Sequence, residues 1–278
     1  WETEMLSPLV GRPDWYEVSY VFTDRNLSSA LVNTFSASGF GIINAGNFTN
    51  TTLLASASIE YSNNNTKYSN KKLDKNMIYA SIHYNVDSLS DVQRTAYTVW
   101  SHKSTNSAIS VEFYPVLYEI APPIAKWFRQ NRTTNDMLIS ADLGCGLANL
   151  SVMKPSTATK FRKINEHFLK MCGIDVVSDG QKIYTLGSFN DMLDGLTAPE
   201  TESNITASIS FIDVDGFKNW ISKVEPISNA PMYFLIDMSA VNFTGYEFVQ
   251  VDKIITEILK NKKDVIKFVH VKNILQYM

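Results

Sequence analysis

The sequence predicts an α/β fold of repeated strand–helix units: a β/α (TIM-like) barrel with some irregularity, or alternatively an open doubly wound parallel sheet. Short apolar, β-branched runs alternate with helical periodicity along most of the 278 residues, as in parallel strands joined by crossover helices. Hydrophobic residues make up 45% of the chain, which is enough for one large core. No G-x-G-x-x-G follows the first predicted strand, so a dinucleotide-binding sheet is disfavoured.

The first predicted elements follow an irregular lead-in over residues 1–16. They are a strand over residues 17–22, a helix over 26–38 and a strand over 40–45. The helix carries apolar residues at helical spacing, and Gly39 is its predicted C-terminal stop because glycine readily adopts the left-handed conformation found there. Together these elements form the first predicted strand–helix–strand unit of the fold.

A strongly polar stretch interrupts the pattern around residues 62–75, where residues 62–70 read SNNNTKYSN. Such a segment has nothing to bury, so it is predicted to be a surface loop. Residues 17–278 are therefore predicted to form a single β/α barrel-like domain that contains this loop.

The remaining elements alternate regularly to the end of the chain. The predicted strands cover residues 77–83, 108–113, 136–141, 174–177, 206–212, 232–236 and 265–269. The predicted helices cover residues 91–100, 120–129, 156–171, 188–196, 216–224, 245–260 and 272–277. Pro122 and Pro123 suit a first helical turn, where the missing N–H groups would have no partner. Gly173 is the predicted stop of the long helix before it.

Composition restricts the compartment and the partners. The net charge of -3 gives no electrostatic basis for nucleic-acid binding, and no apolar run approaches the roughly 20 residues of a transmembrane segment. Two cysteines make no disulfide framework. The chain starts at Trp1, so any signal peptide would lie upstream.

Acceptor sequons for N-linked glycans, N-x-S/T, are frequent in this chain. The eight acceptors are Asn26, Asn47, Asn50, Asn64, Asn131, Asn149, Asn204 and Asn242. Several fall in polar segments predicted to be loops. The alternative is that these asparagines are unmodified. The pattern favours an extracellular or cell-surface, secreted glycoprotein with N-linked glycans.

Acidic and amide side chains dominate the carboxyl ends of the predicted strands, where parallel α/β folds place their reactive face. They include Asn85, Asp87, Asp142, Asp213 and Asp237. Such a rim can hold sugar hydroxyls, bind a divalent cation, or supply the acid and base of glycoside cleavage. For any single Asp, helix capping or solvation is the alternative interpretation.

Glu112 is an acidic residue in a predicted strand that also carries Ile109, Val111 and Phe113. If Ile109, Val111 and Phe113 face one side, Glu112 faces the other. In a barrel that side is the packed interior, where an unpaired carboxylate is unfavourable. Glu112 is therefore predicted to be either an inward functional acid or the partner of a base.

Other familiar chemistries are not indicated. The four histidines lack H-x-x-x-H and H-E-x-x-H spacing, so a zincin site is excluded and neither a metal nor a cofactor is predicted. His83 and His270 fall in predicted strands and are interpreted as hydrogen-bonded core residues. Cys145, between two glycines, is interpreted as a small residue in a tight loop. No G-x-S-x-G elbow and no P-loop occurs.

Residues 111–150 read VEFYPVLYEIAPPIAKWFRQNRTTNDMLISADLGCGLANL. The order and spacing of Ala121-Pro122-Pro123, Asn135-Asp136 and Gly144-Cys145-Gly146 resemble the C-terminal domain of bacterial proteins named for their GxGYxYP motif, which are inferred glycoside hydrolases. The resemblance extends more weakly over residues 17–277. It implies a β/α barrel that handles carbohydrate, with Gly144 and Gly146 beside the substrate.

The chain departs from this family at two places. The Tyr-x-Tyr-Pro after the glycines becomes Leu147-Ala148-Asn149-Leu150, which removes two aromatic rings suited to stacking on sugars. In the family's Asp-Gly-Asp-Asn run only Asp87 is kept, with Asn85 and Ser88 replacing its neighbours. Loss of one carboxylate removes an acid–base partner, which points to a changed or lost activity.

Two functional hypotheses follow. The first is an extracellular glycoside-hydrolase-like domain that acts on or binds polysaccharide, with Asp87, Glu112 and Asp142 as candidate catalytic residues. Its candidate substrate-binding residues are Asn85, Gly144, Gly146, Asp213 and Asp237. The second is a non-catalytic structural subunit of a cell-surface assembly or filament, in which the chain would form a homo-oligomer.

Overall fold

The structure is a computed structural model. It describes residues 19–23, 28–44, 74–84, 86, 99–101, 108–133, 135–140, 146–178, 183–185, 207–227, 230–238 and 245–275.

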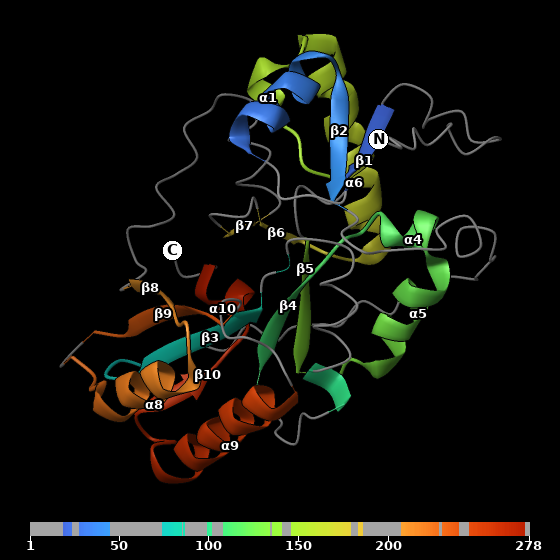
Figure 1. The fold of residues 1–278 in the computed structure, drawn as a ribbon. Helices are drawn as coiled ribbons and strands as arrows, with labels where there is room; N and C mark the ends of the chain where they lie inside the picture. The colour runs from blue at the N-terminus through green and yellow to red at the C-terminus, as the bar shows by residue number, and fades with distance from the viewer. Residues whose placement is uncertain are drawn as a thin grey trace.

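A curved, mostly parallel sheet forms a half-barrel with helices around it (Figure 1), which confirms the predicted α/β class. Its strands, in spatial order, are β7 (Ile183–Thr185), β6 (Val176–Ser178), β5 (Asp136–Ser140), β4 (Ile109–Phe113), β3 (Ile78–Tyr84), β9 (Met232–Asp237) and β8 (Ala207–Ser210). The pairing of β6 with β7 is antiparallel. That hairpin was not predicted, because three-residue strands are too short to show a period.

Helices cover the convex side of the sheet, and their buried faces form two apolar clusters with the strands. The first cluster joins β4 and β5 to α4 (Leu117–Ile120), α5 (Pro122–Asn131) and α6 (Pro155–Cys172). The second joins β3, β4 and β9 to α8 (Val214–Lys223) and α9 (Gly245–Asn261). Burial of these amphipathic faces is the main stabilising contribution to the fold.

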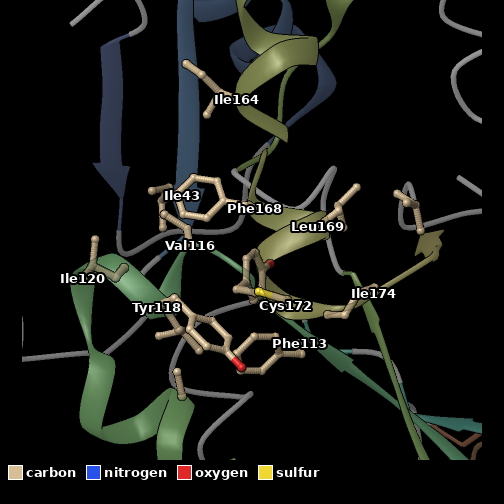
Figure 2. Close-up of a cluster of buried hydrophobic side chains, with 14 of the residues drawn as sticks. Ile43, Phe113, Val116, Tyr118, Ile120, Ile164, Phe168, Leu169, Cys172 and Ile174 are labelled. Carbon is tan, nitrogen blue, oxygen red and sulfur yellow. The ribbon is translucent and has the colours of Figure 1, made fainter. Parts of the chain in front are cut away.

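Figure 2 shows the first cluster, where Phe113 and Tyr118 lie against Cys172 of α6. Cys172 is a free, buried thiol. Burial raises the pKa of this thiol, which favours the neutral form and makes Cys172 a packing residue. Gly173 follows it with φ 64 and ends α6 in the left-handed conformation, as predicted.

The last described elements of the chain fill the concave side of the sheet. β10 (Ile266–Phe268) pairs with the first part of β3, whereas β4 pairs with the last part of β3. Because β9 occupies the opposite edge of β3, β10 and β4 share one edge. The chain then enters the hollow as α10 (Val271–Leu275) (Figure 1).

α10 packs on the side chains that point into the half-barrel. They are mostly apolar, and include Tyr79, Met137, Ile139, Val176, Tyr233 and Leu235. In a closed barrel, layers of strand side chains fill this space. Here a helix contributes Val271, Ile274 and Leu275 to the same role.

The N-terminal elements form a small unit with its own two-stranded sheet. β1 (Ser19–Thr23) and β2 (Phe40–Asn44) pair in parallel with each other and not with the half-barrel, and α1 (Ser29–Ala37) connects them. Gly39 has φ 88 just after α1, as expected for a helix stop. Figure 2 shows Ile43 of β2 against Phe168 of α6, so the unit shares the main core.

Most predicted elements match the structure to within a few residues. The predicted helix over 188–196 and the polar loop over 62–73 lie outside the residues that the structure describes, and the predicted helix over 91–100 is described only at its end. Among the helices of the described segments, none combines the length and apolarity needed to span a bilayer.

We predict that Ile274→Ala destabilises the protein by about 2–5 kcal/mol, because it leaves a cavity between α10 and the concave face of the sheet. Ile274 is fully buried, whereas Ile227 is 57% exposed. The matched substitution Ile227→Ala should therefore change stability by less than about 1 kcal/mol. Urea unfolding followed by circular dichroism measures both. Equal effects would show that α10 does not pack on the sheet as described.

Candidate functional site

Three ionisable side chains lie near the carboxyl ends of three adjacent parallel strands. His83 on β3 is in register with Ser110 on β4 and with Asp237 on β9. Glu112 lies two residues beyond Ser110 on the same face of β4. Alternation along the strands turns all of these side chains toward the concave face, because their neighbours Ile82, Val111 and Ile236 belong to the convex-side cluster.

Glu112 is buried and both of its carboxylate oxygens are engaged. Oε1 lies 3.2 Å from His83 Nε2, and Oε2 accepts a hydrogen bond of 3.0 Å from the backbone N–H of Val86. The side chain of Glu112 is 1% exposed and that of His83 is 9% exposed. Of the two predicted roles of Glu112, this geometry corresponds to the partner of a base, because His83 is its neighbour.

Asp237 closes the other side of the site at the end of β9. Its Oδ2 accepts a hydrogen bond of 3.3 Å from the hydroxyl of Ser210 on β8. The following residue, Met238, donates its backbone N–H to the carbonyl of His83. Asp237 is only partly buried, so this carboxylate is reached by solvent more readily than that of Glu112.

The floor of the site is polar as well. Ser81 and Ser110 are fully buried and lie on the same face as His83, and the backbone N–H of Val271 reaches Ser110 Oγ at 3.5 Å. Tyr84, the next residue after His83, points to the convex side. Burial, and then the negative charge of Asp252, raise the pKa of Tyr84, so its phenol stays neutral.

Asp213 has a local structural role. It is the N-cap of α8, and its Oδ1 accepts a 2.6 Å hydrogen bond from the backbone N–H of Gly216. Asp213 is exposed and follows β8, so it lies at the same edge of the sheet as Asp237. The capping interpretation of a strand-end Asp therefore holds for this residue.

Gly146 is placed against the backbone of β2. Leu147 exchanges two backbone hydrogen bonds with Ile42, of 2.7 and 2.9 Å. Gly146 has φ 126, and a Cβ there would lie 2.9 Å from the carbonyl oxygen of Ile42. The close approach of two backbones thus requires a glycine at this position, which gives Gly146 a packing role.

Asn149 extends the same junction toward α1. Its backbone N–H donates to Ser36 Oγ at 2.9 Å, and its Nδ2 donates to Asn33 Oδ1 at 2.7 Å. Its Oδ1 accepts from the backbone and hydroxyl of Ser151. Among the other sequons, Asn131 is exposed at the last residue of α5 and donates Nδ2 to Trp127 O at 2.8 Å.

The remaining predicted site residues lie outside the described residues. They are Asn85, Asp87, Asp142 and Gly144, together with the sequon asparagines Asn26, Asn47, Asn50, Asn64, Asn204 and Asn242. No group of three or more potential metal-ligating side chains occurs in the segments that the structure describes.

His83 is the residue whose importance the sequence did not reveal. It lies in a buried strand, where the sequence alone indicates a hydrogen-bonded core residue with no further role. The available signal was its strand position: His83 directly precedes the end of β3, just as Glu112 directly precedes the end of β4. Two such residues meet only if their strands are neighbours in the sheet. The order of the strands is a property of the tertiary structure.

We predict that Gly146→Ala destabilises the protein by about 3 kcal/mol, because any side chain combines an unfavourable φ with a clash against Ile42. Gly216→Ala is the matched control. Gly216 has no positive φ, and an added Cβ would lie 3.2 Å from a side-chain oxygen that can shift, so the change should stay within about 1 kcal/mol. Thermal or urea unfolding measures both. Similar stabilities for the two variants would contradict the assigned role.

Comparison with known proteins supports the fold. No protein-family model and no curated protein matches this chain. A solved structure of an inferred hydrolase from Bacteroides thetaiotaomicron VPI-5482 superposes on 92% of the chain with a TM-score of 0.64 and 13% sequence identity. This chain spans 56% of the length of that protein. At this identity the likeness is one of fold, and it agrees with the half-barrel seen here.

Proposed function

We propose that this chain is a hydrolase-like domain that acts on a glycan, within a secreted or cell-surface glycoprotein. The observation that carries the proposal is the convergence of Glu112, His83 and Asp237 on the concave face, at the carboxyl ends of three adjacent parallel strands. This edge is where parallel α/β folds perform their chemistry.

The carboxylate arrangement favours hydrolysis of a glycosidic bond. Glu112 and Asp237 belong to strands on either side of β3, so their backbones are separated by two strand spacings, or about 10 Å. Side chains on a concave face converge, which brings the two groups toward the roughly 6.5–9.5 Å used by inverting glycosidases. The fold shared with an inferred hydrolase supports a hydrolytic reaction, and the GxGYxYP-like residues support a glycosidic substrate.

The glycoprotein part of the proposal is supported by the sequons. Asn131 is exposed at the end of α5, a position that leaves room for a bulky, soluble sugar. Eight sequons in one chain are consistent with passage through a secretory route.

A second function, a non-catalytic structural or carbohydrate-binding subunit, is favoured by one observation. Both oxygens of Glu112 are occupied by groups of the protein, as expected for a buried polar contact that holds Val86 in place. In this alternative the site is an inherited structural contact, and the chain assembles through interfaces of more than about 1,000 Å².

We predict that the purified protein cleaves at least one member of a panel of 4-nitrophenyl glycosides and polysaccharides, and that Glu112→Gln and Asp237→Asn each lower kcat by at least about tenfold. Both substitutions keep the size of the side chain and remove its charge. Released nitrophenol and reducing ends measure the activity, and circular dichroism confirms folding.

Glu166→Gln is the matched control, because Glu166 lies on α6 and pairs there with Lys170 in solvent. Its activity should equal that of the original chain. Folded Glu112→Gln and Asp237→Asn proteins with full activity would refute the assigned site. Absence of turnover on the whole panel, together with assembly into large oligomers on light scattering, would favour the structural subunit.

We predict that protein from its native source carries an N-linked glycan at Asn131. Peptide mapping with and without enzymatic removal of N-glycans measures occupancy. Asn219 is an exposed asparagine in the sequence Asn-Trp-Ile, which is no sequon, so it should remain unmodified in the same map. Unmodified asparagine at all eight sequons would refute the glycoprotein proposal.

A further inference from the structure

Glu112 and His83 differ in what they can still contact. The carboxylate of Glu112 is 1% exposed and is engaged at both oxygens, whereas the imidazole of His83 is 9% exposed and is held at one nitrogen, Nε2. A group that takes part in proton transfer must reach the substrate or a water molecule within hydrogen-bond distance. Of these two residues, the geometry therefore leaves that role to His83.

We propose that His83 is the proton-transfer residue of the site and that Glu112 is its positioning residue. This inference rests on the proposed hydrolase function but replaces one role within it: His83 takes the place of Glu112 opposite Asp237, and Glu112 acts on His83 and not on the substrate. Asp237, in register with His83 and more open to solvent, is the second group that meets the substrate.

The tautomer of His83 follows from the partners of Glu112. An ionised carboxylate only accepts hydrogen bonds, and Oε2 already accepts one from the backbone of Val86. The contact at Oε1 then requires the proton of the neutral imidazole to sit on Nε2. Nδ1 is left as the basic nitrogen, and the imidazolium formed after proton uptake is stabilised by the adjacent negative charge.

The reaction is a hydrolysis that balances without a cofactor. Nδ1 of His83 takes a proton from a water molecule as the water oxygen bonds to the anomeric carbon. The glycosidic C–O bond breaks with its electron pair on the leaving oxygen, which takes a proton from the carboxyl group of Asp237. Afterwards His83 releases one proton to solvent and Asp237 regains one.

The backbone holds this arrangement in place from three sides. Met238 donates its N–H to the carbonyl of His83, Ser110 is the register partner of His83 on β4, and Val86 is tied to Glu112. The contact with Glu112 then orients the imidazole, which is what a carboxylate contributes to histidine in other hydrolytic sites.

The first test needs no substrate. Nitrogen-15 NMR of the ¹⁵N-histidine-labelled protein, well above about pH 6.5 where an ordinary imidazole is neutral, distinguishes the protonated from the bare ring nitrogen. The His83 signal is assigned by its loss in His83→Gln. We expect the proton on Nε2 in the original chain. In Glu112→Gln we expect a mixture of the two tautomers, with the proton on Nε2 or on Nδ1.

The second test separates positioning from direct participation in an active protein. His83→Gln should lower kcat by about 10²–10⁴-fold, and Glu112→Gln by about 10–100-fold with little change in KM. His167→Gln is the matched control, because His167 is exposed on α6, and it should leave activity unchanged.

The outcomes distinguish the two proposals. A proton on Nδ1 of His83, or full activity of folded His83→Gln, overturns the inference while the hydrolase function stands. An original chain that is inert on the whole glycoside panel overturns the hydrolase function, and with it the reactive role of His83, whatever the tautomer.

Discussion

The sharing of one edge of β3 between two other strands is the constraint on which the rest of the structure depends. β10 hydrogen-bonds to the first part of that edge and β4 to the last part, while β9 takes the opposite edge along almost the whole strand. Because β10 occupies part of the edge, the sheet opens there and the chain passes into the hollow as α10. The half-barrel is thus filled by a helix where a closed barrel would use strand side chains.

This arrangement divides the concave face into two levels. The lower level is mostly apolar, apart from Ser81 and Ser110, and is covered by Val271, Ile274 and Leu275. The upper level carries His83, Glu112 and Asp237 at the ends of their strands. A buried carboxylate is tolerated only with its hydrogen bonds satisfied, and the contacts of Glu112 with His83 and Val86 meet that condition. The same contacts stabilise the site and restrict which of its members can meet a substrate.

The glycine motif shows how a recognisable pattern can serve packing. Gly146 lets one backbone approach another, so that Leu147 pairs with Ile42 and Asn149 reaches α1. These contacts attach the β1–α1–β2 unit to the half-barrel, together with the side chain of Ile43 in the main core. A glycine in such a motif signals a special backbone position, and the structure places Gly146 at a junction between two sheets.

The sequence by itself determined the elements and the class of the fold. Periodicity placed the long helices and the apolar strands, and local chemistry placed their ends, as at Gly39 and Gly173, because capping and left-handed residues act within a few neighbours. The alternation of side chains along the strand over residues 108–113 also predicted that Glu112 points inward. Only the tertiary structure decided that β3 lies between β4 and β9, that α10 enters the hollow, and that β1 and β2 pair apart. Strand order depends on contacts between distant segments, which no local pattern encodes. For that reason His83, the partner of Glu112, became visible only once the chain was folded.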